Sequence, residues 1–138
     1  MPSYTPPLRD MQFVLHEVFQ VADEYKAMPT HADTDADTIN AVLEEAGKFA
    51  AGVTFPLNVS GDAEGCRLDA ATHAVTTPQG FKEAYAAYVE GGWPALSCDP
   101  RYGGQGLPHV VNQCLYEMLN SANQAWTMYP GLSHGAYE

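Results

Sequence analysis

Apolar residues recur at steps of three and four positions in several stretches of this chain, which is the spacing of a helix with one buried face. The first stretch covers residues 11–25 and ends before Pro29. The second covers residues 38–53, and Pro56 together with the run at 58–61 closes the predicted helix. The pattern therefore predicts two amphipathic helices in the first half of the chain.

Polar segments precede and follow the second helix. Residues 31–38 contain three aspartates and suit a solvated connector. Asp35 or Asp37 is predicted to cap the second helix, because an aspartate carboxylate accepts hydrogen bonds from the first backbone amides. Residues 62–77 show no helical period, so an irregular or hairpin-like excursion is expected near 60–77.

A third helix is predicted after this excursion. Thr77-Pro78 is a helix-start signal, since threonine can cap and a proline in the first turn lacks only an unpaired N–H. The apolar stripe then runs over residues 81–89, and Gly91-Gly92 ends the helix. A loop rich in glycine and proline follows, up to Pro108.

The clearest apolar stripe of the chain follows Pro108, over residues 110–122. A further helix over residues 123–137 is an open alternative. No convincing run of alternating strand residues is present. The expected fold class is therefore all-α, a bundle of four to five helices that bury their apolar faces against one another.

Composition narrows the function classes. Six Lys and Arg residues against seventeen Asp and Glu residues leave a net charge of −11, which disfavours nucleic acid and anionic membranes as partners. No apolar run approaches the roughly 20 residues that a membrane helix needs, and no leader pattern opens the chain, so a cytoplasmic protein is expected. The three cysteines lack Cys-x-x-Cys spacing and are expected to be free, mostly buried thiols.

The chain contains few candidates for chemistry. Gly103, Gly104 and Gly106 precede a helix and would suit an anion cradle, but Arg101 is the only nearby cation, so a tight structural turn is favoured. The five histidines show no metal-ligand spacing, and no metal site is expected. Glu117 lies on an otherwise apolar helix and must reach solvent, pair, or line a cavity.

Aromatic residues gather near the end of the chain, with Trp126 and Tyr129 flanking Met128. They suit either an ordinary core or a face made for another domain. Together with the stripe over residues 110–119, they predict an apolar surface that the isolated chain exposes, and hence self-association at high concentration.

Four segments together resemble the acyl-CoA dehydrogenase superfamily. The start, Tyr-Thr-Pro-Pro-Leu-Arg-Asp-Met-Gln-Phe-Val-Leu at 4–15, resembles the N-terminal extension of the large bacterial subgroup that includes methylmercaptopropionyl-CoA dehydrogenase. Phe-Pro-Leu-Asn at 55–58 resembles the end of the second family helix. Gly-Gly-Trp at 91–93 and Tyr-Gly-Gly-Gln-Gly-Leu-Pro at 102–108 resemble the core of the N-terminal helical domain, and Met-Tyr-Pro-Gly-Leu at 128–132 resembles the start of the flavin domain.

What this resemblance implies is a two-electron oxidation by the complete enzyme. A carboxylate base removes the α-proton of an acyl-CoA thioester while hydride passes from the β-carbon to FAD. In such enzymes the flavin and the base are held by domains that this sequence lacks. No catalytic, cofactor-binding or metal-binding residue is therefore expected here, and the chain alone should be inactive and free of FAD. An electron-transfer flavoprotein is the implied partner of the complete enzyme.

The resemblance assigns four residues to the wall of the acyl tunnel, namely Gln113, Glu117, Tyr129 and Leu132. It also divides the chain into an extension helix over 1–30 and an N-terminal helical domain over 31–138, truncated before the flavin-binding β-domain. The chain would then be a piece of a longer protein or the product of a split gene. Two alternatives stay open: a stand-alone helical module that binds a protein partner, and a relative that serves in the response to DNA alkylation.

Overall fold

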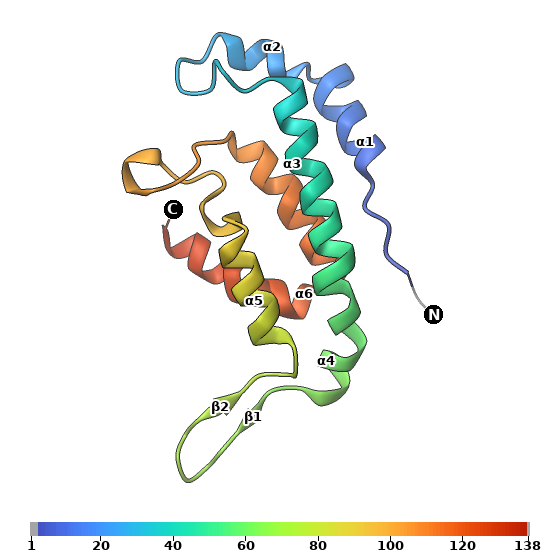
Figure 1. Cartoon of the computed structure of the whole chain (residues 1–138), viewed down its shortest axis with the longest axis vertical. Helices are drawn as coiled ribbons and strands as arrows, with labels where there is room; N and C mark the ends of the chain where they lie inside the picture. The colour runs from blue at the N-terminus through green and yellow to red at the C-terminus, as the bar shows by residue number, and fades with distance from the viewer. Residues whose placement is uncertain (1–2, 138) are drawn as a thin grey trace.

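Residues 36–64 form a continuous helical rod in the computed structural model, which describes residues 3–137 (Figure 1). Asp35 caps the rod, as predicted, because its carboxylate accepts a hydrogen bond of 2.8 Å from the amide of Thr38. The ends of the predicted domain ranges, residues 1–2 and Glu138, lie outside the described residues. The segments of the rod are α3 (Ala36–Phe49), the π-helical η2 (Ala50–Thr54), the 3₁₀ turn η3 (Phe55–Leu57) and α4 (Asn58–Glu64).

The prediction that Pro56 and residues 58–61 close this helix is wrong, because the chain stays helical through Glu64. Pro56 stands in the first positions of the 3₁₀ turn, where a missing N–H removes no necessary helical hydrogen bond. The π-helical turns before it shift the hydrogen-bond register and so accommodate the proline. The irregular excursion accordingly begins only after Glu64.

The N-terminal segment forms two helices where one was predicted. α1 (Leu8–Gln12) continues into the π-helical η1 (Phe13–Val18), and α2 (Val21–Lys26) follows after a break. The break lies at Gln20, whose φ of 50° is left-handed and cannot continue a right-handed helix. Met11, Leu15 and Tyr25 are buried in the same core as the rest of the chain. The division into an extension and a domain stays a prediction.

The excursion is a β-hairpin that projects from one end of the bundle (Figure 1). Its strands, β1 (Arg67–Leu68) and β2 (Val75–Thr76), pair in antiparallel register with Leu68 opposite Val75. α5 (Phe81–Glu90) begins three residues after Pro78, since Gly80 takes a left-handed φ of 86° that excludes it from the helix. The loop after α5 contains the 3₁₀ turns η4 (Trp93–Ala95) and η5 (Pro100–Tyr102).

The last helix, α6 (His109–Tyr137), begins directly after Pro108, as predicted. Its backbone is not helical at Asn123 (φ −160°, ψ 87°), so we describe it as limb 1 (109–122) and limb 2 (124–137). Limb 2 folds back along limb 1, since 3.2 Å separates Asn112 Nδ2 and His134 Nε2. The open alternative of a fifth helix is thus correct, and residues 128–132 belong to it.

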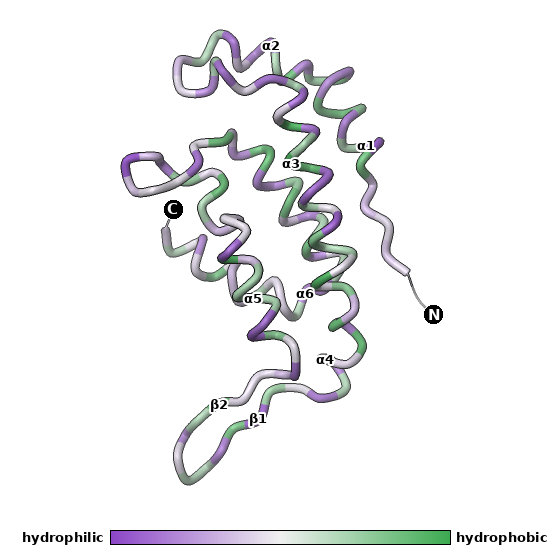
Figure 2. The backbone as a smooth tube through the Cα atoms, in the orientation of Figure 1, coloured by the Kyte–Doolittle hydropathy of each residue, from purple (hydrophilic) through white to green (hydrophobic). Residues whose placement is uncertain are grey.

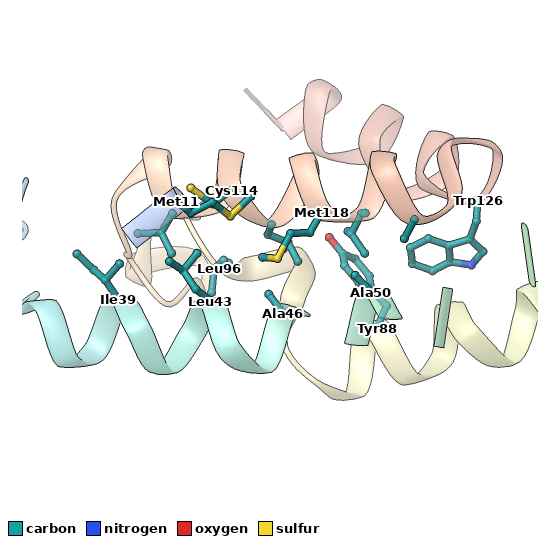
Figure 3. Close-up of a cluster of buried hydrophobic side chains, with 14 of the residues drawn as sticks. Met11, Ile39, Leu43, Ala46, Ala50, Tyr88, Leu96, Cys114, Met118 and Trp126 are labelled. Carbon is teal, nitrogen blue, oxygen red and sulfur yellow. The ribbon is translucent and has the colours of Figure 1, made fainter. Parts of the chain in front are cut away.

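The core lies between the rod, α5 and limb 1 (Figure 3). Polar and apolar residues alternate along these helices, in agreement with the predicted periodicity (Figure 2). Among the described helices, none is long and apolar enough to cross a membrane. The largest fully buried apolar side chains are Trp126, Tyr88, Ile39, Leu43, Leu96, Leu115, Met118, Leu119 and Val111.

The apolar surface predicted on residues 110–119 is not exposed. Val111, Leu115, Met118 and Leu119 have 0% exposure, because limb 1 is enclosed by its neighbours in the bundle. Trp126 is equally buried, whereas Met128 and Tyr129 keep exposures of 53% and 38%. Self-association through the limb 1 stripe therefore has no structural basis. Other large apolar side chains do reach solvent, among them Phe13, Val18, Phe19 and Leu132.

Candidate functional site

A groove of about 500 Å³ lies between α5 and limb 2, with the end of the hairpin at one side; we call it the α5–limb 2 groove. The groove exists because limb 2 turns back at Asn123 and runs beside α5. Four of its lining side chains are aromatic. The lining consists of Val75, Thr77, Phe81, Lys82, Tyr85, Trp126, Tyr129 and Ser133.

The two walls of the groove are joined by one hydrogen bond and several ring contacts. Trp126 Nε1 donates to the carbonyl of Phe81 at 3.2 Å, and both groups are buried. The ring of Phe81 meets Tyr129 edge-to-face, with centroids 6.1 Å apart at 86°, and Tyr85 lies 6.5 Å from Trp126. These spacings are typical of favourable aromatic pairs, so α5 and limb 2 hold each other at a defined separation.

The polar groups of the groove are few. The hydroxyl of Tyr129 lies 3.2 Å from the Cys66 thiol, and this hydrogen bond, followed by burial, raises the pKa of Tyr129. Lys82 is exposed and places an ammonium group beside the aromatic walls. The lining residues include no carboxylate and no histidine. Such a groove suits binding of an apolar chain, and it lacks a side-chain pair for acid–base chemistry.

The four residues expected to wall the acyl tunnel are all exposed, but they do not share one place. Tyr129 lines the α5–limb 2 groove, and Leu132 lies one helical turn further along limb 2 with 70% exposure. Gln113 and Glu117 lie on limb 1 and are not part of the groove lining. The structure therefore separates the predicted set into two pairs on the two limbs.

The limb 1 pair has its own surroundings. Gln113 Nε2 lies 2.7 Å from His109 Nε2, one turn earlier on the same helix. Glu117 reaches solvent, which is the first of the three alternatives stated for it. Burial raises the pKa of the neighbouring Cys114 thiol, and the charge of Glu117 adds to the shift. Neither side chain faces a described cavity in this chain.

The glycine-rich loop is a structural turn, as predicted. The amides of Gly103, Gly104 and Gly106 all donate to backbone carbonyls of the loop itself, at 3.0–3.1 Å. The guanidinium of Arg101 is bound by the carboxylate of Asp99 at 2.6 and 2.9 Å. Neither free amides nor a free cation remain for a phosphate in this loop, so it does not fit the diphosphate of FAD.

Cysteine and histidine side chains form no metal centre within residues 3–137, where no cluster of three potential ligands occurs. All three cysteines are free thiols, as expected. Cys114 is buried and Cys98 half-buried, but Cys66 is exposed at the start of the hairpin, so the expectation of mostly buried thiols holds for two of the three. Cys66 lies directly before β1, and its thiol is 3.2 Å from the Tyr129 hydroxyl of limb 2.

Several residues of the groove were not singled out from the sequence as site residues. The sequence predicts that Phe81 and Tyr85 belong to the buried stripe of their helix, and it gives no signal for Lys82 or Ser133. They become neighbours only because limb 2 folds back beside α5. The pattern of apolar residues predicts each helix but not this reversal.

A second groove, of about 560 Å³, lies between α3 and the loop side of α5; we call it the α3–α5 groove. Phe49, Trp93 and Leu96 give it an apolar floor, and Gln105 closes one end through a 2.8 Å hydrogen bond to the carbonyl of Gly92. Ala41, Val42, Glu45, Ala87 and Gly91 complete the lining. Residues of α5 thus line both this groove and the α5–limb 2 groove.

No protein-family model matches the chain. Three characterised proteins do resemble it over nearly its whole length. It is 36% identical over 99% of its residues to 3-methylmercaptopropionyl-CoA dehydrogenase of Ruegeria pomeroyi. It is 34% identical over 95% to a broad-specificity linear acyl-CoA dehydrogenase of Mycobacterium tuberculosis, and 30% identical over 97% to butyryl-CoA dehydrogenase of Syntrophomonas wolfei. The chain spans 23%, 21% and 22% of the lengths of these relatives.

Proposed function

We propose that this chain, which belongs to the acyl-CoA dehydrogenase family and matches the N-terminal region of its members, is the N-terminal helical domain of a longer FAD-dependent dehydrogenase. The complete protein would oxidise an acyl-CoA thioester between its α- and β-carbons. Similarity to three acyl-CoA dehydrogenases over at least 95% of the chain carries this proposal. A chain about one fifth as long as its relatives would supply one part of the site and leave the flavin chemistry to other parts.

In this proposal the α5–limb 2 groove forms part of the wall along which the acyl chain lies. Its aromatic lining and its lack of a carboxylate suit an apolar ligand. Tyr129 and Leu132 would contact the acyl chain from limb 2. Gln113 and Glu117 would contact the substrate only if the acyl chain also passes along limb 1 in the complete protein.

A chimera tests the proposal directly. The chain replaces the matching region of the Ruegeria pomeroyi relative, and flavin content and acyl-CoA-dependent bleaching of the flavin are measured. We expect a soluble, yellow protein whose flavin is reduced by an acyl-CoA. The matched control carries Leu115→Asp, which disrupts the core of the exchanged domain. A soluble wild-type chimera that binds FAD but is not reduced by any acyl-CoA would contradict the proposal.

The same chimera tests the four wall residues one at a time. Alanine at Tyr129 or Leu132 should change the ratio of kcat/KM between butyryl-CoA and decanoyl-CoA, because the side chain contacts the acyl tail and not the thioester. Alanine at Gln113 or Glu117 should do so if limb 1 also faces the substrate. Equal kcat/KM ratios for all four variants and the parent would remove these residues from the tunnel wall.

The chain by itself is proposed to be inactive and to hold no FAD, since its glycine-rich loop offers no cradle for the diphosphate. Purified chain should therefore be colourless after desalting. Flavin absorbance in stoichiometric amount would contradict this. The complete enzyme would be located in the cytoplasm, where an electron-transfer flavoprotein would reoxidise the flavin. The net charge of −11 argues against nucleic acid as a partner.

An alternative function is a non-catalytic module that binds a protein partner. The α3–α5 groove favours it, because an apolar floor around Trp93 can receive an apolar side chain of another protein. The chimera distinguishes the two functions. A stand-alone module would yield a chimera without acyl-CoA-dependent flavin reduction, whereas Trp93→Ala would still abolish capture of its partner.

A further inference from the structure

One buried polar side chain lies at the reversal of α6. Asn123 is 1% exposed, and its backbone is extended between two helical limbs. Its side-chain oxygen accepts a 3.0 Å hydrogen bond from the amide of Trp126, which is the geometry of an N-cap for limb 2. Its side-chain nitrogen donates at 3.0 Å to the carbonyl of Thr54 in the rod. The same amide group therefore begins limb 2 and ties that beginning to the rod.

The surroundings of Asn123 make both bonds necessary. Thr54 is 0% exposed and lies where the π-helical segment meets the 3₁₀ turn, with its own hydroxyl donating to the carbonyl of Ala50 at 3.0 Å. Thr127 is also buried and donates from its hydroxyl to the carbonyl of Asn123 at 2.8 Å. A buried polar group without a partner is costly, so this network permits few replacements at position 123.

Only a short side chain that both accepts and donates satisfies the network. Aspartate keeps the cap acceptor but loses the donor toward Thr54 and places a charge against a carbonyl oxygen. Serine keeps a cap acceptor but is too short to replace the amide donor toward the rod. Both replacements therefore keep the cap of limb 2 and remove its tie to the rod.

The direction of limb 2 sets one wall of the α5–limb 2 groove. Trp126 and Tyr129 follow Asn123 within two helical turns, and the indole of Trp126 is bonded to Phe81 on the opposite wall. A change in the starting direction of limb 2 moves Tyr129 relative to α5, because the helix behaves as a rigid arm over this length.

We propose that Asn123 is a positioning residue that orients limb 2 through its hydrogen bond to Thr54, and so determines the width of the α5–limb 2 groove. The effect on the acyl chain rests on the proposed function of the groove. The positioning of limb 2 does not rest on that proposed function, and a separate experiment measures it.

Amide hydrogen exchange tests the positioning on the chain itself. Asn123→Ser should speed the exchange of limb 2 amides about tenfold or more relative to limb 1 amides, because limb 2 opens once its tie is lost. Asn123→Asp should speed it further, and the serine variant keeps the test valid if the aspartate variant does not fold. The matched control is Asn120→Ser, three residues earlier, where the exposed amide donates only to the carbonyl of Tyr116. Equal acceleration in both limbs, or none, would overturn the proposal.

The chimera supplies the functional readout. With FAD content unchanged, Asn123→Ser should alter the kcat/KM ratio between butyryl-CoA and decanoyl-CoA at least threefold, while Asn120→Ser should leave it unchanged. If limb 2 amides exchange faster and the kcat/KM ratio does not change, the result supports the positioning role. It would contradict the proposal that the α5–limb 2 groove forms part of the wall of the acyl tunnel. A changed ratio without faster exchange in limb 2 overturns the positioning role.

Discussion

Limb 1 and limb 2 of α6 are both helical but differ in their surroundings. Both carry apolar residues at helical spacing, yet the stripe of limb 1 is enclosed by the bundle, whereas limb 2 buries Trp126 and then exposes Leu132 at 70%. The difference arises because limb 1 lies in the interior of the helical bundle, whereas limb 2 lies at the side of the bundle (Figures 1 and 3). Helical periodicity thus indicates which residues share a face, and the neighbours decide whether that face is buried.

The largest expected effect comes from a matched pair of leucines. Leu115→Ala on limb 1 should lower the free energy of unfolding by about 2–5 kcal/mol, because it removes a fully buried side chain and leaves a cavity. Leu132→Ala on limb 2 should change it by less than about 0.5 kcal/mol. Urea unfolding followed by circular dichroism measures both. A similar loss for the two variants would refute the contrast between the limbs.

A smaller effect is expected at Trp126, the largest buried side chain of limb 2. Trp126→Phe should cost about 1–3 kcal/mol, because the Phe81 carbonyl loses its indole partner while the ring packing is largely retained. Trp93→Phe, in the half-buried loop, serves as the control and should cost less. If Trp126→Phe is as stable as the parent in urea, the hydrogen bond between α5 and limb 2 is not what anchors that limb.

Alkaline pH should distinguish the buried thiol of limb 1 from the exposed thiol of the hairpin that contacts limb 2. Burial raises the pKa of Cys114 on limb 1, so the folded state keeps its proton to higher pH than the unfolded state does. The contribution of Cys114 to stability should therefore be constant near neutral pH and fall as pH rises above about 8.5, the pKa of an unfolded cysteine. Burial raises the pKa of Tyr88 in the same sense, which adds a further loss above about pH 10.

The cysteine contribution is isolated by two variants. Cys114→Ala should remove the loss between about pH 8.5 and 10, and Cys66→Ala, at the exposed thiol beside Tyr129, should retain it. Urea midpoints at several pH values measure both. An identical pH profile for the two variants would contradict the effect expected from burial of the Cys114 thiol.

The smallest expected effect lies at the end of limb 2. Gly135→Ala should stabilise the chain by at most about 1 kcal/mol, since alanine favours the helix and its methyl group meets no atom within 4 Å. Gly103→Ala has equally open space but a φ of 87°, so it should destabilise instead. A lower melting temperature for Gly135→Ala would mean that limb 2 needs a glycine for a reason other than helix stability.

Local chemistry was sufficient for the elements whose signals lie within a few residues. The Asp35 cap, the start of α6 after Pro108 and the closed glycine-rich turn were all predicted, because each depends on nearby backbone amides. Pro56 was misinterpreted as a helix end, because a preceding π-helical segment can carry a helix past a proline. The break at Gln20 gave no local signal at all.

The candidate site was only partly predictable for the same physical reason. Tyr129 was named from a motif, but its neighbours Phe81, Lys82 and Ser133 join it only through the reversal at Asn123. At that reversal the side chain of Asn123 donates a hydrogen bond to a carbonyl 69 positions earlier in the chain, that of Thr54. The sequence by itself determined most of the helical segments, their apolar faces and the resemblance to the acyl-CoA dehydrogenases, since these follow from short-range spacing and motifs. Tertiary structure alone decided which faces are buried and where a groove opens, because burial and hydrogen-bond pairing depend on residues distant in the chain.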